Sequence, residues 1–88
     1  MNLPKARESV IVQQENEDFF LVDTEGGEVF EVNASAAKIF ALCRAGASYD
    51  SAVAALSEGL IVTGQESEIL ADVRETVAQF AQLGLCEA

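Results

Sequence analysis

The chain has 88 residues, half of them hydrophobic, and carries 5 Lys and Arg against 15 Asp and Glu, a formal net charge of −10. So short a chain has room for one core but not for a deep cofactor cleft, and its charge repels polyphosphate, so we expect no nucleic-acid partner. No run approaches the roughly 20 apolar residues of a membrane span, and residues 1–9 lack a signal-peptide core. We therefore expect one cytoplasmic domain over residues 1–88, with an ordered core at about residues 9–85 and no membrane partner.

The first third of the chain predicts a three-stranded antiparallel meander. β-branched and aromatic residues recur in three short runs, which are Val10–Val12, Phe19–Val22 and Val29–Val32. Polar residues separate the runs, and the Gly26-Gly27 pair suits a tight hairpin turn. No phosphate-binding glycine motif follows that pair, so we interpret it as a turn alone.

Two short helices are predicted after the strands. Asn33 is a good N-cap, and the residues after it place an apolar stripe on one helical face until Gly46 ends the helix. Ser48 caps a second helix, for which Gly59 is the stop signal. Residues 60–64 form the predicted linker to the rest of the chain.

A longer third helix is predicted from Gln65 or Glu66 to about Leu83, with Gly84 as its stop. Leu85 is the apolar contact that commonly follows a helix ending in glycine. The resulting order is β-β-β-α-α-α, which predicts an α+β fold. We expect a winged helix-turn-helix, in which the three helices pack against a wing-like three-stranded antiparallel sheet.

Side chains that usually carry catalysis or hold a metal ion are scarce in this chain. It has no histidine, and its two cysteines, Cys43 and Cys86, lie far apart in sequence. Neither thiol has an evident activating partner, so we expect a protein that is not an enzyme, with no catalytic residue, no metal site and no cofactor. We interpret the cysteines as structural thiols in a reducing compartment, and a disulfide between them stays an alternative.

Two other functional classes are compatible with parts of the sequence. Asp50-Ser51, at the start of the second predicted helix, is the pattern of a small acidic acyl or peptidyl carrier that bears phosphopantetheine. A carrier would have leucine next, where this chain has Ala52, and three strands before the first helix contradict the four-helix carrier plan. Asp50 and Ser51 are more simply first-turn residues. The carrier and a winged-helix regulatory domain are kept as alternatives.

The third predicted strand, Gly27–Val32, is a candidate peptide-binding edge. If the strands pair in sequence order, one side of this strand has backbone groups that can receive another chain, and the third helix can wall a groove beside it. A proline at Val29 or at Glu31 is then expected to weaken peptide binding, at only one of the two positions. The alternative is a strand that the helix covers, and the pattern alone leaves both open.

Residues 29–43, with the sequence VFEVNASAAKIFALC, resemble the strand-to-helix segment of PqqD-like proteins. Residues 52–56 are similar to the middle helix of that family. Asp72-Val73 and Leu83-Gly84-Leu85 are similar to its closing helix and the end of that helix. The resemblance spans roughly residues 10–85 and depends on the order and spacing of short pieces.

The resemblance implies a RiPP recognition element, a winged helix-turn-helix domain that binds the leader segment of a ribosomally synthesised precursor peptide. It implies that the leader adds as a strand beside the third strand and against the third helix, for delivery to a modifying enzyme such as a radical SAM enzyme. Carried over by position, the peptide-binding residues are Glu28, Val29, Phe30, Glu31, Val32, Leu70, Val73, Arg74 and Val77.

Several of these positions also have a core interpretation, namely Phe30, Val32, Val73 and Val77. Arg74 is the only basic residue on the long helix and is the predicted partner of an acidic leader residue. The family often has Cys-Asp-Gly where this chain has Cys43-Arg44-Ala45-Gly46, which argues against the PQQ branch itself. The net charge favours docking on a basic enzyme surface, and we expect a monomer or a dimer.

Overall fold

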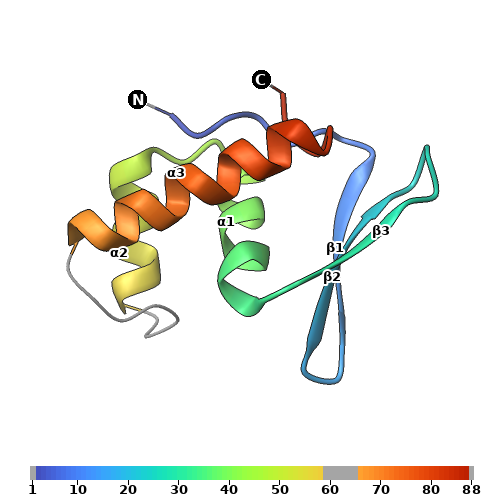
Figure 1. Cartoon of the computed structure of the whole chain (residues 1–88), viewed down its shortest axis with the longest axis horizontal. Helices are drawn as coiled ribbons and strands as arrows, with labels where there is room; N and C mark the ends of the chain where they lie inside the picture. Colours follow the sequence, from blue (N-terminus) through green and yellow to red (C-terminus); the bar gives the residue numbers. More distant parts are fainter. Residues whose placement is uncertain (1, 59–65, 88) are drawn as a thin grey trace.

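A computed structural model describes residues 2–58 and 66–87 of the chain. Three strands precede three helices: β1 (Val10–Glu15), β2 (Asp18–Asp23), β3 (Val29–Val32), α1 (Ala34–Ala45), α2 (Tyr49–Glu58) and α3 (Glu66–Gln82). The predicted α+β order is confirmed. The helices gather on one side and the sheet stands beside them, with the β1–β2 hairpin projecting away (Figure 1). The predicted stop at Gly59 and the linker at residues 60–64 lie outside the described residues.

The sheet is a meander in which β2 pairs antiparallel with both of its neighbours. Glu15 pairs with Asp18, so a two-residue turn joins β1 to β2, and Asn16 takes a positive φ of 59° there. The carboxylate of Asp23 stabilises the β2–β3 turn, because it accepts hydrogen bonds from the backbone amides of Glu25 and Gly26. These bonds, from Gly26 first and then from Glu25, lower the pKa of Asp23.

Side-chain caps and left-handed residues set the helix ends where the sequence predicts them. Asn33 Oδ1 accepts from the amide of Ala36 at 2.8 Å, and Gly46 ends α1 with a φ of 75°. Ser48 Oγ accepts from the amide of Ser51 at 3.1 Å at the start of α2. The predicted N-caps of α1 and α2 and the predicted stop of α1 are therefore confirmed.

The core lies between the helices and one face of the sheet. Phe40 of α1 and Phe80 of α3 meet edge to face, with ring centroids 5.5 Å apart. Val10 and Leu21 contribute the fully buried side chains of the sheet. The opposite face of the sheet has no helix packed on it among the described residues, and Ile11 there is 45% exposed.

An N-terminal arm packs against the end of the chain. Leu3 and Ala6 are both buried, and the amide of Arg7 donates to the carbonyl of Leu85 at 3.0 Å. Both ends of the described chain lie on the same side of the molecule (Figure 1). The packed structure therefore begins before the predicted boundary at about residue 9, because the arm contributes apolar side chains to the core.

The two cysteines lie together in this core. Cys43 and Cys86 are both buried and are free thiols. Their hydrogen bond and their burial raise the pKa of the Cys43 thiol, while the same hydrogen bond lowers the pKa of Cys86.

No helix in the part of the chain that the structure describes is long and apolar enough to cross a membrane.

Candidate functional site

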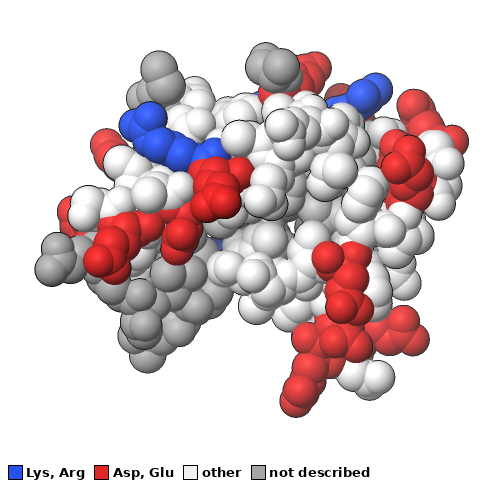
Figure 2. Space-filling view, in the orientation of Figure 1, with Lys and Arg blue, Asp and Glu red and all other residues white. Residues whose placement is uncertain are grey.

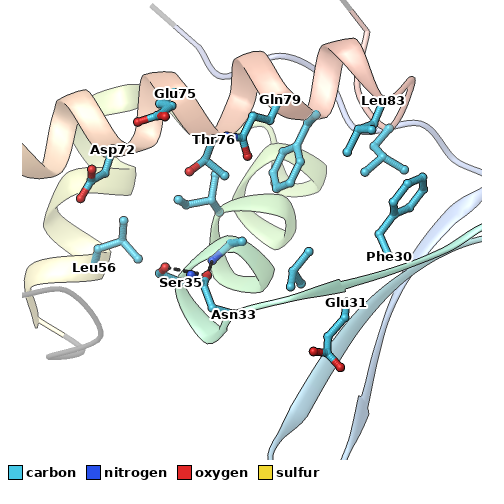
Figure 3. A pocket seen from close by; sticks show the side chains of 15 residues that line it. Phe30, Glu31, Asn33, Ser35, Leu56, Asp72, Glu75, Thr76, Gln79 and Leu83 are labelled. Atoms are coloured by element: carbon cyan, nitrogen blue, oxygen red, sulfur yellow. Dashed lines mark hydrogen bonds between the residues drawn. The ribbon is translucent and has the colours of Figure 1, made fainter.

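A groove of about 500 Å³ lies between β3 and α3, with α1 behind it (Figure 3). The strand contributes Phe30, Glu31 and Val32 to its lining. Figure 3 shows α3 running along the opposite wall. The helices and the chain ends contribute the other lining residues, which are Asn33, Ser35, Ala36, Ile39, Leu56, Asp72, Glu75, Thr76, Gln79, Phe80, Leu83 and Leu85.

The outer edge of β3 carries backbone groups that no described strand pairs with. The amide of Asp23 donates to the carbonyl of Glu28 at 2.8 Å, so Glu28 directs its backbone groups towards β2. Backbone groups alternate between the two sides of a strand, so Phe30 also points to β2, whereas Val29 and Glu31 point outward. The expectation that only one of Val29 and Glu31 faces the free edge is therefore wrong, because residues two apart in a strand are equivalent.

The side chains of β3 alternate between the groove and the outer face of the sheet. Phe30 pairs with the buried Leu21 and points towards α3, while Glu31 points away from the groove (Figure 3). Val29 lies on the outer face as well and is 60% exposed. The side chain of Phe30 therefore lines the groove, whereas the outward backbone groups beside it belong to Val29 and Glu31.

The two ends of the groove differ in chemistry. At one end the apolar side chains of Phe30 and Leu83 both line the groove, and Leu83 is 51% exposed (Figure 3). At the other end the carboxylates of Asp72 and Glu75 line the wall formed by α3. No Lys or Arg stands among the described residues that line the groove. On the face shown in Figure 2, acidic atoms gather along α3 and at the tip of the β1–β2 hairpin.

The residues predicted on β3 meet at this site. Phe30, Glu31 and Val32 lie along the groove, although the side chain of Glu31 points away from it (Figure 3), and Glu28 and Val29 continue the same edge. Phe30 and Val32 are half-buried and also pack against the core. Their position therefore agrees with the core interpretation and also leaves them beside the groove.

The residues predicted on α3 lie away from the groove. Val73 and Val77 are buried in the core, and Leu70 faces α2 beside Val53. The guanidinium of Arg74 stacks over the ring of Tyr49, 5.5 Å from its centroid. At about 100° of rotation per residue, positions 70 and 74 lie about half a turn from the groove-lining positions. Their contact with a peptide stays a prediction, and the geometry does not favour it.

Sequence reasoning missed the groove-lining face of α3, which is formed by Asp72, Glu75, Thr76, Gln79 and Leu83. The sequence predictions include Leu83 only as the end of the third helix and as part of the Leu83-Gly84-Leu85 resemblance. A signal was available, because Leu83 is a large apolar residue off the stripe that contains Ile69, Val73, Val77 and Phe80.

The alternative functions find less support in the geometry. Ser51 is exposed in the first turn of α2, where its amide is capped by Ser48, and the sheet is incompatible with a four-helix carrier. Within residues 2–58 and 66–87 no cluster of three or more His, Cys, Asp or Glu side chains is placed to hold a metal ion.

Two solved structures share this fold. One is TbiB1 in complex with the TbiA(beta) leader peptide, which is 19% identical, has a TM-score of 0.77, and matches over 96% of this chain and 95% of that chain. The other is lasso peptide synthetase B1 complexed with the leader peptide, which is 20% identical, has a TM-score of 0.79, and matches over 96% of each chain. At these identities the similarity shows a common fold.

The family comparison covers most of the chain. No curated protein matches the sequence. The family model of coenzyme PQQ synthesis protein D, PqqD, matches residues 18–85, which include β2, β3 and the three helices that surround the groove. The chain therefore belongs to the PqqD family.

Proposed function

We propose that this protein is a non-catalytic recognition module that binds the leader segment of a ribosomally synthesised precursor peptide. The observation that carries the proposal is the outer edge of β3, which pairs with no described strand, beside a groove with an apolar end. Membership of the PqqD family supports it, and so does the common fold with two proteins that were solved with leader peptides.

Binding proceeds by strand addition. The N–H and C=O groups of Val29 and Glu31 pair with the backbone of the peptide. Each of these hydrogen bonds contributes roughly 0.5–1.5 kcal/mol to the net binding free energy. Alternate side chains of the peptide then enter the groove between Phe30 and α3. Main-chain pairing supplies affinity for any extended segment, and the groove supplies the choice among sequences.

The module serves a separate modifying enzyme, for example a radical SAM enzyme, to which it presents the peptide. The formal charge of −10 favours a basic docking surface on that enzyme and an association rate that falls as salt rises. Catalysis resides in the partner, because the described residues that line the groove include no evident activated nucleophile or base.

Titration of the isotope-labelled protein with candidate leader peptides tests this function. The peptides are taken from short reading frames beside the gene, and backbone amide shifts are followed by NMR. We expect the largest shifts at residues 28–32 and along the groove-lining side of α3. Shifts confined to other elements, or no shift with any neighbouring peptide, would overturn strand addition at β3.

A further inference from the structure

We propose that the segment bound in the groove carries a basic side chain about four residues away from a large apolar side chain. This specificity rests on the function proposed above, because it assumes an extended peptide along β3. It goes further by stating the chemistry of that peptide, and it follows from the different composition of the two ends of the groove.

The apolar end selects a large hydrophobic side chain. Leu83 is 51% exposed although it directly follows α3 and neighbours a core residue, Leu85. It lines the same end of the groove as the half-buried ring of Phe30 (Figure 3). A leucine or aromatic side chain of the peptide, placed between these two, removes apolar surface of both walls from water.

The acidic end selects a cation. Asp72 and Glu75 lie one turn apart on α3 and both line the groove. The nearest basic residue in sequence, Arg74, is stacked on Tyr49 on the other side of the helix. Since no described basic residue lines the groove, an acidic peptide side chain at this end meets two like charges, and a lysine or arginine meets two opposite ones.

The spacing follows from the geometry of helix and strand. Glu75 and Leu83 are 83 − 75 = 8 positions apart, which corresponds to about 12 Å along a helix at 1.5 Å per residue. An extended peptide covers that length in about four residues at 3.3 Å each. An even separation also places both peptide side chains on the same face of the added strand, which is the face that enters the groove.

The resulting preference is opposite to the one expected from Arg74 in the sequence. A groove-facing Arg74 would select an acidic leader residue, whereas the groove-facing pair Asp72 and Glu75 selects a basic one. The two expectations differ in sign, so one binding experiment separates them.

The first measurement uses fluorescent ten-residue peptides of Thr and Gln that contain a single Leu. Each peptide carries Lys, Gln or Glu at one other position, and fluorescence anisotropy gives its Kd. We expect Lys at the fourth position from Leu to bind about fivefold more tightly than Gln, and Glu to bind about fivefold more weakly, from the usual strength of exposed charge pairs.

A charge reversal in the protein identifies the partner of that lysine. Glu75→Lys is expected to abolish the preference for the Lys peptide and to create one for the Glu peptide. Glu17→Lys changes the net charge equally, but Glu17 lies in the β1–β2 turn outside the groove, so the original preference should persist. The gain for the Glu peptide shows that the Glu75→Lys variant is folded and binding.

The outcomes distinguish this proposal from the function on which it rests. If peptides bind at β3 with no charge preference, or if both variants respond alike, the basic-peptide specificity is overturned while strand addition stands. If no peptide of the set binds while a leader peptide from a neighbouring reading frame does, only the basic-peptide specificity is overturned. If bound peptides shift amides away from β3 and α3, both are overturned.

Discussion

The two flanks of α3 have similar exposure but different surroundings. On one flank Asp72, Glu75 and Leu83 line an open groove. On the other, Arg74 lies over Tyr49 and so belongs to the contact between α2 and α3. The buried stripe of Ile69, Val73, Val77 and Phe80 lies between the two flanks. The contrast teaches that hydrophobic periodicity locates the buried side of a helix, while the position of β3 decides which flank is available to a ligand.

The largest effect is expected in the stripe between the flanks. Ile69 is 1% exposed, so Ile69→Ala should lower the free energy of unfolding by about 3 kcal/mol, through lost burial and a residual cavity. Urea denaturation followed by circular dichroism measures the change. Ala78→Ser, on the exposed side of the same helix, is the control and should change stability by less than about 0.5 kcal/mol.

Proline substitutions compare the two sides of β3. Val29→Pro and Glu31→Pro each remove an outward N–H group, so both should weaken peptide binding about tenfold with little loss of stability. Phe30→Pro removes a bond to β2 and should destabilise the fold instead. Peptide titration and urea denaturation of the three variants decide the matter. Full affinity in both edge variants would show that the peptide does not pair with β3.

Arg74 tests the other flank of α3 directly. Arg74→Gln should leave the affinity for leader peptides within about twofold, and should cost about 0.5–1 kcal/mol of stability through the lost contact with Tyr49. Calorimetric titration and thermal unfolding measure the two quantities. A loss of affinity as large as that of Glu75→Lys would instead place Arg74 in the binding site, as the sequence alone predicts.

The smallest effect concerns the β2–β3 turn that leads into the binding edge. The turn amides lower the pKa of Asp23 below its ordinary 3.8, so this carboxylate stabilises the fold above that pH, and the contribution is lost as the pH falls through the lowered pKa. Asp23→Asn should therefore make stability less dependent on pH below about pH 4. Urea midpoints across an acidic pH series measure it, and an unchanged pH dependence would contradict the assignment.

The fold follows from local signals in the sequence. Asn33, Ser48 and Gly46 act within one or two turns of the backbone, and the structure confirms each of them as a cap or stop. The strand runs and the buried stripe of α3 are equally local, since periods of two and 3.6 residues are visible without knowledge of packing. The elements and the part of the core that they form were therefore predictable, whereas the buried N-terminal arm with Leu3 and Ala6 was not.

The site was only half predictable for a physical reason. The edge of β3 follows from strand order, which short turns make the natural choice, so the position of residues 28–32 at this edge was predictable. The facing residues of α3 depend on the rotation of the helix relative to the sheet, and that rotation is set by tertiary packing. Positions carried over from the resemblance therefore fell on the buried stripe and the far flank, including Val73 and Arg74.

Because side chains alternate along β3, a partner enzyme could distinguish the peptide-bound module from the empty one. Ile11, Val22 and Val29 are cross-strand neighbours on the uncovered face of the sheet, and two of them are 45% and 60% exposed. An added strand directs every second side chain onto that same face. An enzyme that docks there would touch module and cargo at once, so the loaded module would present a wider surface than the empty one. Recognition of the peptide and recruitment of the enzyme would then be thermodynamically linked, without any movement of the helices.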